Sequence, residues 1–233
     1  MQAMQTILIC PALLFLFIWR HIKTQYKLSN VLQNTNKLGG TCMEKKRNNT
    51  LFLVEVAVFS ALAYLLDLVS GLLSLKIWPQ GGSISIAMVP IFIMSFRWGV
   101  KGGILSGFLL GLLQFILGFS QIYTLLQGII DYAIAFSVVG LAGIFASQVK
   151  ASLSHNNRKK WVTFVLLGTF LGSALRYLAH VISGIVFFGE YAPEGQPAAV
   201  YSLLYNGTYM LPSFIVCAII VILVITAAPK KMI

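Results

Sequence analysis

Long apolar runs, separated by short polar or glycine-containing breaks, fill the chain from about residue 51 to about residue 227. Such runs predict transmembrane helices, because about 20 apolar residues in a helix span the hydrocarbon core of a bilayer. The second run is short and contains Pro90, so we expect it to be tilted or flanked by irregular backbone buried in protein. The six predicted spans are about Leu51–Leu75, Ile84–Phe96, Gly102–Phe119, Tyr123–Ser147, Trp161–Phe188 and Ala198–Ala227.

Composition supports this all-α membrane class. Of the 233 residues, 58% are hydrophobic and 10% are charged, whereas a soluble domain is about one quarter charged. The difference excludes an ordinary soluble enzyme, a disordered chain and a disulfide scaffold. The three cysteines, Cys10, Cys42 and Cys217, have neither paired nor metal-ligand spacing, so we expect no disulfide framework, no metal site and no cofactor.

The basic residues predict an orientation. A net charge of +11 would favour nucleic acid as the partner of a soluble protein, but here the basic residues lie at the ends of the apolar runs. One set of loops carries eleven of them, and the other set carries only Lys76, with Glu190 and Glu194. The positive-inside rule then places both termini in the cytoplasm, and nucleic acid is not an expected partner. The eleven residues are Lys45, Lys46, Arg47, Arg97, Lys101, Lys150, Arg158, Lys159, Lys160, Lys230 and Lys231.

Residues 1–42 differ from the rest of the chain. Their one apolar run, Thr6–Trp19, is short for a membrane span, and a polar stretch without periodicity follows it. The codons of Gly39 and Gly40 must read GGNGGN, which can form a purine-rich ribosome-binding sequence just before the Met43 codon. We therefore expect a translated leader or non-native extension over 1–42 and a six-helix substrate-binding domain over 43–233. A genuine N-terminal membrane anchor is the alternative.

Small residues recur at the spacing that lets membrane helices approach closely. Gly103, Gly107 and Gly111 follow this spacing on the third predicted span, and packing within the bundle is the default interpretation. The pair Ala57 and Ala61 on the first span has a second interpretation, a docking face for another membrane subunit.

Ionisable groups inside a span are costly and usually functional. Asp131 lies eight residues past the start of the fourth predicted span, and His180 lies eight residues before the end of the fifth, so both are about 12 Å deep. Arg176 lies one turn from His180 on the same helix face. Tyr201 and Asn206 of the sixth span reach the same layer, which predicts one site built from three helices.

Aromatic side chains are expected near this layer, and together with a carboxylate, an imidazole and an amide they suit a flat, cationic, hydrogen-bonding molecule. The alternative is an internal pair of Asp131 with Arg176 or His180 that only joins helices. The expected aromatics are Trp78, Tyr132, Phe187, Phe188 and Tyr205.

Asp67 lies nearer the end of its span, where its side chain can reach the membrane surface or pair with Lys76.

The chain has no Gly-x-x-x-x-Gly-Lys-Ser/Thr loop and no His-Glu-x-x-His motif, so the sequence does not predict ATP hydrolysis or metalloprotease activity.

Five stretches carry a resemblance to a known family. They are Ser83–Ile91 (SISIAMVPI), Ser95–Gly103 (SFRWGVKGG), Leu126–Tyr132 (LQGIIDY), Leu175–Gly184 (LRYLAHVISG) and Tyr201–Met210 (YSLLYNGTYM).

Together these stretches closely resemble the thiamine-specific S component of energy-coupling factor (ECF) transporters of Gram-positive bacteria, from about Val54 to Lys231. The resemblance implies a six-helix protein of the bacterial plasma membrane with an extracellular-facing thiamine pocket and no enzyme activity of its own. It also implies a transmembrane coupling subunit, which docks on the motif of Ala57 and Ala61, and two cytoplasmic ATPase subunits that energise uptake.

The resemblance also assigns roles to residues. Asp131 matches an acidic pocket residue that would bind the aminopyrimidine and balance the thiazolium charge. His180 and Arg176 match a pocket histidine and a basic residue that is Lys in some members. Tyr201 and Asn206 match hydrogen-bonding positions of the pocket.

Aromatic positions of the pocket carry over less uniformly. Tyr132 follows the acidic residue as in the family, and Phe188 stands where some relatives have Trp. Trp78 resembles the aromatic residue of the first outer loop, although that loop is spaced differently here. Gln121 falls where some relatives have Tyr, and Tyr123 lies two residues on, so either residue is a candidate for facing the ligand.

Two other functions stay open at this point. The same fold could bind another vitamin or a thiamine precursor such as a hydroxymethyl-pyrimidine. A small intramembrane enzyme could use Asp131 and His180 as an acid–base pair, and it would show substrate turnover with a bell-shaped pH profile.

Overall fold

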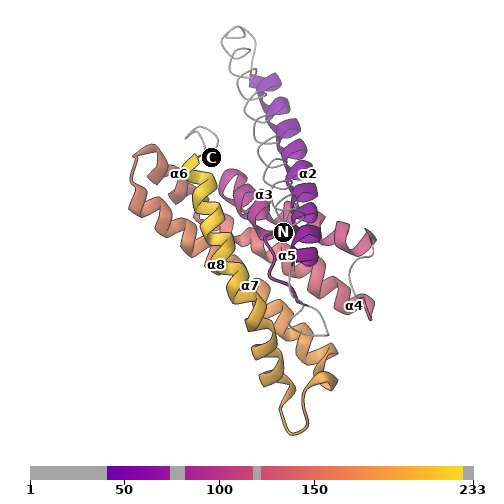
Figure 1. The fold of residues 1–233 in the computed structure, drawn as a ribbon. Helices are drawn as coiled ribbons and strands as arrows, with labels where there is room; N and C mark the ends of the chain where they lie inside the picture. Colours follow the sequence, from indigo (N-terminus) through magenta and orange to yellow (C-terminus); the bar gives the residue numbers. More distant parts are fainter. Residues whose placement is uncertain (1–40, 74–81, 118–121, 228–233) are drawn as a thin grey trace, which may run out of the picture. The chain divides into compact units, whose positions relative to one another are not determined.

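The computed structural model describes residues 41–73, 82–117 and 122–227, and these residues form helices joined by short connections (Figure 1). The chain divides into two compact units, Met1–Leu51 and Phe52–Ile233, and the second holds nearly all of the described residues. The elements are α2 (Thr41–Leu73), α3 (Met88–Leu117), α4 (Leu125–Gly128), η1 (Ile129–Ile134), α5 (Ala135–Val139), η2 (Gly140–Phe145), α6 (Ala146–Ser154), α7 (Arg158–Phe187), η3 (Gly189–Tyr191) and α8 (Ala198–Ala227).

Five helical stretches of the described chain are long and apolar enough to cross a membrane, so the all-helical membrane class is confirmed. Most of the predicted second span and most of the predicted third span lie in α3, which explains why five stretches stand where the sequence predicted six. The count of six spans and the cytoplasmic termini stay predictions. The five stretches are Asn49–Gly71, Met88–Leu117, Leu125–Ser154, Arg158–Phe187 and Ala198–Ala227.

Helix α3 consists of two arms that meet at Gly99. The backbone there has φ 74° and ψ −164°, which is outside the helical region. Glycine adopts positive φ without the steric penalty of a Cβ atom, so this position lets the chain change direction between the arms. Pro90 is the third residue of α3, within the first turn, where a missing N–H group breaks no helical hydrogen bond. A non-helical segment, residues 82–87, precedes the helix, as expected for this region.

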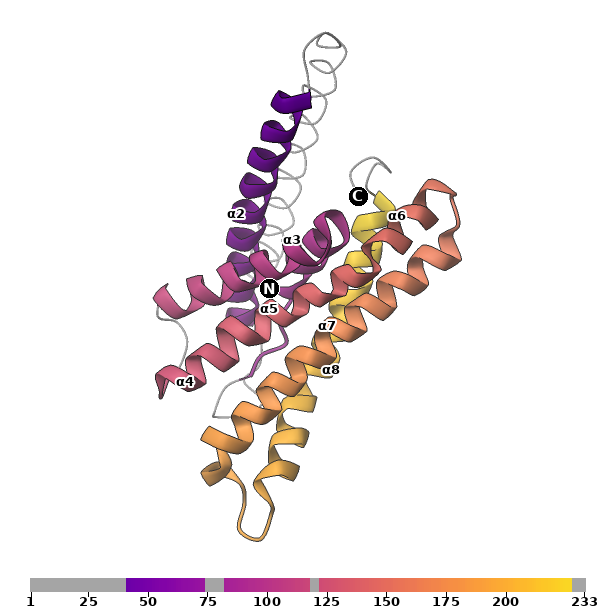
Figure 2. The same ribbon diagram turned by 180° about the vertical axis from the view of Figure 1, so that it is seen from behind.

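The glycines of α3 allow the second arm to lie directly against the helix formed by α4 to α6, and Figure 2 shows the two side by side. A Cβ atom on Gly107 would lie 2.1 Å from the carbonyl oxygen of Phe136, and one on Gly111 would lie 2.5 Å from that of Tyr132. Gly103 and Gly140 face each other in the same way, with 2.7 Å from an ideal Gly103 Cβ to the Gly140 Cα. The predicted packing role of these small residues is therefore confirmed.

A partly buried ion pair joins α2 to α3 at the elbow, the bend between the two arms of α3. Arg97 donates from Nε to Oε2 of Glu55 at 2.6 Å and from Nη2 to Oε1 at 2.7 Å. Trp98 Nε1 donates to Oε2 of the same carboxylate at 2.6 Å, and Lys150 Nζ donates to the Arg97 carbonyl at 2.6 Å. The bidentate geometry fixes the orientation of the Glu55 and Arg97 side chains.

Elsewhere in the bundle, α7 and α8 lie side by side in both views (Figures 1 and 2).

The contact at Gly107 predicts a stability effect. We expect Gly107→Ala to lower the thermal unfolding midpoint in detergent, because its methyl group would meet backbone atoms of Phe136 at 2.1 and 2.6 Å. Such overpacking costs about 1–3 kcal/mol, which exceeds the gain of about 1 kcal/mol from replacing Gly by Ala in a helix. Gly71→Ala is the matched control, since its Cβ would have nothing within 4 Å. Equal midpoints for the two variants would contradict this account.

Candidate ligand-binding site

Asp131 lies in η1, a π-helical turn inside the longer helix that begins at Leu125. Single π turns are rare and occur often at functional sites, because they change the direction of a side chain relative to a regular helix. The Asp131 residue is 8% exposed. A carboxylate buried to this degree in a membrane protein needs several hydrogen-bond donors.

Gln127 supplies one of these donors, with Nε2 at 2.7 Å from Asp131 Oδ2. The Gln127 side chain is itself held, because its Oε1 accepts from the backbone N–H of Tyr123 at 3.1 Å. The backbone N–H of Gln127 donates to Thr124 Oγ1 at 3.2 Å, and this bond caps the start of α4. The first turn of this helix therefore orients the amide toward the carboxylate.

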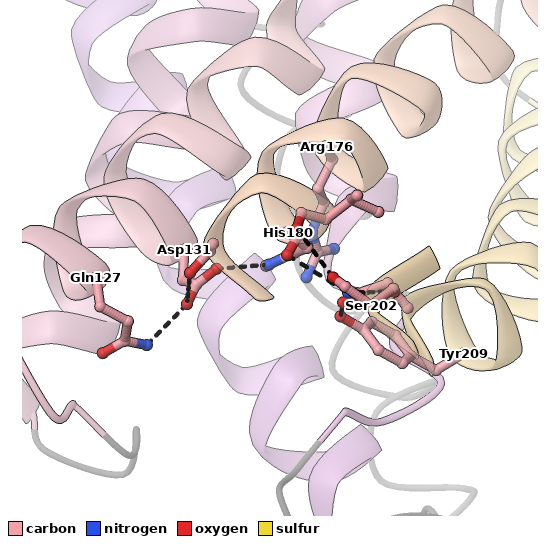
Figure 3. A network of polar contacts seen from close by, with 9 residues as sticks. Gln127, Asp131, Arg176, His180, Ser202 and Tyr209 are labelled. Atoms are coloured by element: carbon pink, nitrogen blue, oxygen red, sulfur yellow. Dashed lines mark hydrogen bonds and ion pairs between the residues drawn. The ribbon is translucent and has the colours of Figure 1, made fainter. Parts of the chain in front are cut away.

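Helix α7 supplies the other two donors. Ser183 Oγ donates to Asp131 Oδ2 at 2.8 Å, and His180 Nδ1 lies 3.0 Å from Asp131 Oδ1. Figure 3 shows His180 in the middle of the polar row, between Asp131 on one side and Tyr209 on the other. Within the described residues, Oδ2 has two donors and Oδ1 has one, which leaves Oδ1 with capacity to accept another hydrogen bond.

Arg176 fixes the tautomer of His180. Its Nε donates to His180 Nε2 at 3.2 Å, and a guanidinium group can only donate. The Nε2 atom must therefore be the acceptor nitrogen, and the ring proton lies on Nδ1, where it donates to the Asp131 carboxylate. His180 is thus neutral in this arrangement, between a cationic and an anionic side chain.

The Arg176 guanidinium also lies over an aromatic ring, with its Cζ 4.0 Å from the centroid of Phe136. Its Nη1 is buried and has no hydrogen-bond partner among the residues that the structure describes. A buried guanidinium nitrogen without an acceptor is costly. It is therefore a donor available to a bound ligand.

Helix α8 completes the network. Asn206 Nδ2 donates to the carbonyl of His180 at 3.4 Å and to that of Ser202 at 2.8 Å. Ser202 Oγ donates to the Val181 carbonyl at 2.9 Å, and the Tyr209 hydroxyl donates to Asn206 Oδ1. These contacts join α7 and α8 at the level of His180.

Tyrosine rings of α8 form a row beside this network. Tyr201 and Tyr205 are stacked, with centroids 5.9 Å apart, and Tyr205 meets Tyr209 edge-on at 5.7 Å. The Tyr209 ring lies 6.3 Å from the ring of His180. The row thus presents aromatic faces and hydroxyl groups next to the Asp131–His180 pair.

The structure brings Asp131, His180, Arg176 and Asn206 into one network, as the sequence predicted. The internal pair of Asp131 with His180 is present, whereas the Arg176 Nε bond goes to His180. Two other predicted residues lie beside this network. Tyr201 is buried in the row of tyrosine rings, and Tyr132, which follows Asp131 in η1, is half-buried.

Other predicted residues belong to an aromatic group at the end of α7 or lie outside the described chain. Phe188 packs with Tyr123 at 5.6 Å and with Tyr191 at 6.2 Å in this aromatic group. Trp78 and Gln121 lie outside the described residues, as does Lys76, the predicted partner of Asp67.

Sequence reasoning missed Gln127, Ser183, Ser202 and Tyr209. Gln127 precedes Asp131 by four residues and Ser183 follows His180 by three, so helical spacing from the ionisable residues could have found both. The π turn has no comparable signal in the sequence.

The fold and this network define a class of protein: a polytopic helical membrane protein with a buried polar network assembled from three helices. Comparison with known sequences is more specific. The chain belongs to the family described as "Thiamine transporter protein", whose sequence model matches residues 53–233.

Individual relatives agree with this assignment. The chain is 49% identical over 179 residues to the thiamine transporter ThiT of Bacillus subtilis, covering 76% of this chain and 92% of the relative. It is 29% identical over 192 residues to ThiT of Lacticaseibacillus paracasei, covering 80% and 92%. A solved structure of ThiT from Listeria monocytogenes superimposes with a TM-score of 0.73 at 32% identity, covering 79% of this chain and 98% of that one.

The contacts of His180 predict its protonation in the ligand-free protein. We expect ¹⁵N NMR of the imidazole to show a neutral ring protonated at Nδ1, because Nε2 accepts from Arg176 and Nδ1 faces Asp131. His155, which is exposed at the end of α6, provides an internal reference. A ring protonated only at Nε2 would show that the Arg176 hydrogen bond is absent.

Proposed function

We propose that this chain is the thiamine-binding membrane subunit of a vitamin uptake transporter. The observation that carries the proposal is the Asp131 carboxylate, which is held by three donors beside an aromatic row. The same network contains a guanidinium nitrogen, Arg176 Nη1, that has no partner in the described structure. Membership of the thiamine transporter family supports the same substrate.

Thiamine has the groups that this arrangement can satisfy. Its aminopyrimidine ring has an exocyclic amino donor, which suits the remaining capacity of Asp131 Oδ1, and ring-nitrogen acceptors, which suit Arg176 Nη1. Its thiazolium ring is a flat cation, which suits a carboxylate and tyrosine faces such as those of Tyr205 and Tyr209. Hydrogen bonding and stacking would then act on different halves of one molecule.

Charge balance favours a cation over a neutral vitamin. Among the described residues inside the spans, Glu55 and Arg97 neutralise each other as a bidentate pair. The charged groups around the polar network are Asp67, Asp131 and Arg176, and they leave one net negative charge when His180 is neutral. An uncompensated charge in a low-dielectric environment is costly, so a monovalent cation is stabilised there. A neutral pyrimidine precursor would not supply this compensation.

The contacts of His180 disfavour the enzyme alternative. One ring nitrogen faces Asp131 and the other accepts from Arg176, so neither is directed at a substrate. A general acid or base must reach the proton that it transfers. Binding and release without chemical change agrees better with these contacts.

The full proposal includes partners and location. Ala57 and Ala61 are exposed on α2, on the same face as the exposed residues Leu53 and Leu65, so a neighbouring helix could approach closely there. We assign this face to an ECF coupling subunit, with two cytoplasmic ATPase subunits that energise uptake. The chain would lie in a bacterial plasma membrane with six spans, both termini inside, and a native start at Met43.

The substrate assignment is tested by titrating thiamine into the purified protein in detergent, followed by calorimetry and intrinsic fluorescence. We expect saturable binding, with riboflavin and biotin inert. Asp131→Asn should weaken thiamine binding by about one to a few kcal/mol, because the cation loses its counter-charge. Glu190→Gln, a change of the same kind at an exposed position, should bind like wild type. Wild-type affinity in Asp131→Asn would refute the central role of this carboxylate.

The docking face is tested separately. Ala57→Leu together with Ala61→Leu should abolish thiamine uptake by cells that depend on this chain, because larger side chains prevent close helix contact. Thiamine binding by the purified variant should be unchanged, since both side chains lie on the exposed face of α2. Ala151→Leu, at an exposed position of α6, is the control for added bulk. Normal uptake by the double variant would exclude this face as the docking surface.

A further inference from the structure

A second polar cluster, which the binding network does not include, surrounds Asp67 on α2. Ser85 Oγ donates to Asp67 Oδ1 at 2.7 Å, and Gln114 Nε2 donates to Asp67 Oδ2 at 2.6 Å. Ser85 belongs to the non-helical segment of residues 82–87, and Gln114 belongs to the second arm of α3. One carboxylate therefore ties together three parts of the chain that are distant in sequence.

Ser85 is the residue through which this segment is fixed. It is 3% exposed, and each of its polar groups has a partner. Its backbone N–H donates to Ser213 Oγ at 3.0 Å, and its carbonyl accepts from Cys217 Sγ at 3.5 Å. The next residue, Ile86, donates its N–H to Ser70 Oγ at 3.2 Å. The segment is thus anchored to α2 on one side and to α8 on the other.

The anchored segment lies directly against the binding network at Tyr209. An ideal Cβ on Gly82 would lie 2.7 Å from Cδ1 of the Tyr209 ring, so the Gly82 backbone touches that ring. Ser213, which accepts the Ser85 N–H, also donates from Oγ to the Tyr209 carbonyl at 2.6 Å. Tyr209 in turn donates to Asn206 and lies beside the His180 ring. Displacing the segment would remove support from this side of the site.

We propose that Asp67 is a positioning residue of the binding site. Its carboxylate holds Ser85, Ser85 fixes residues 82–87 against Tyr209, and Tyr209 keeps Asn206 and His180 in place. Asp67 acts through these residues and not by contact with the ligand. Because the ligand used to test it is thiamine, the kinetic part of the proposal rests on the proposed function.

The first experiment measures thiamine release by stopped-flow fluorescence on the full chain in detergent. Ser85→Ala removes the link to Asp67, and with it the bond that Ser85 Oγ accepts from the Ala87 N–H at 3.1 Å, without changing the charge. Asp67→Ala removes both hydrogen bonds of the carboxylate. We expect Ser85→Ala to release thiamine about ten-fold faster, the order of size for a lost buried hydrogen bond, and Asp67→Ala to release it at least as fast, with little change in the association rate of either variant. Asp67→Asn retains an acceptor for the Ser85 hydroxyl and should release thiamine more slowly than Asp67→Ala.

Ser60→Ala is the matched control. Ser60 is also a buried serine that joins α2 to α3, with Oγ donating to the Val56 carbonyl at 2.7 Å and to the Ser106 carbonyl at 3.1 Å. It should release thiamine at the wild-type rate. Wild-type release from Ser85→Ala, or equal acceleration in Ser60→Ala, would overturn the proposal. So would acceleration in Asp67→Asn equal to that in Asp67→Ala, since the effect would then come from charge.

A second readout needs no thiamine. In the ligand-free protein, Ser85→Ala should shift or broaden the ¹⁵N signals of the His180 ring, and Ser60→Ala should leave them unchanged. If the wild type fails to bind thiamine but this difference is seen, the proposed substrate is wrong and the positioning role stands. If His180 responds to neither substitution, the positioning role is wrong whatever the ligand is.

Discussion

The burial of one carboxylate is the constraint on which the site depends. Asp131 lies inside a membrane span, where an ionised group without partners would be too costly to retain. Its donors come from the helix that it belongs to and from α7, so its burial requires these helices to keep a fixed distance and rotation. Arg176 then imposes the tautomer in which His180 donates to the carboxylate. The same group that demands these contacts is the one that a cationic ligand needs.

Close backbone packing makes this arrangement possible. Glycines of α3 allow it to lie against η1, α5 and η2 with no side chain between them, so the helix that carries Asp131 is fixed by main-chain contacts rather than by long, flexible side chains. The π turn occurs within this fixed stretch and sets the direction of Asp131. The geometry of the polar network therefore depends on residues that are not part of it, such as Gly107 and Gly111.

Two carboxylates of α2 join this helix to the rest of the bundle in different ways. Glu55 forms a charged, bidentate contact with Arg97 at the elbow of α3. Asp67, three turns further along, accepts from two neutral donors within the described part of the chain, and one of them, Ser85, belongs to the segment that touches Tyr209. If α2 also docks the coupling subunit, one helix connects a partner surface and a binding site.

The sequence by itself determined the all-helical membrane class and much of the polar layer. Charged and imidazole side chains are so costly in hydrocarbon that Asp131, Arg176 and His180 stand out, and the rise of about 1.5 Å per residue places them at one depth. Asn206 was found by the same depth argument. The five family-like stretches, which include these residues, carried the resemblance that the family comparison later confirmed.

Only the tertiary structure decided which neutral groups complete the site. Serine, glutamine and tyrosine are common enough in membrane helices that Ser183, Gln127 and Tyr209 carry no signal of their own. The break at Gly99, the π turn at Asp131 and the role of Ser85 depend on contacts between segments far apart in sequence. Phe188 likewise packs with Tyr123 and Tyr191 because of where α7 ends. Depth in the membrane follows from counting along one helix, whereas the direction and partners of a side chain follow from how several helices pack.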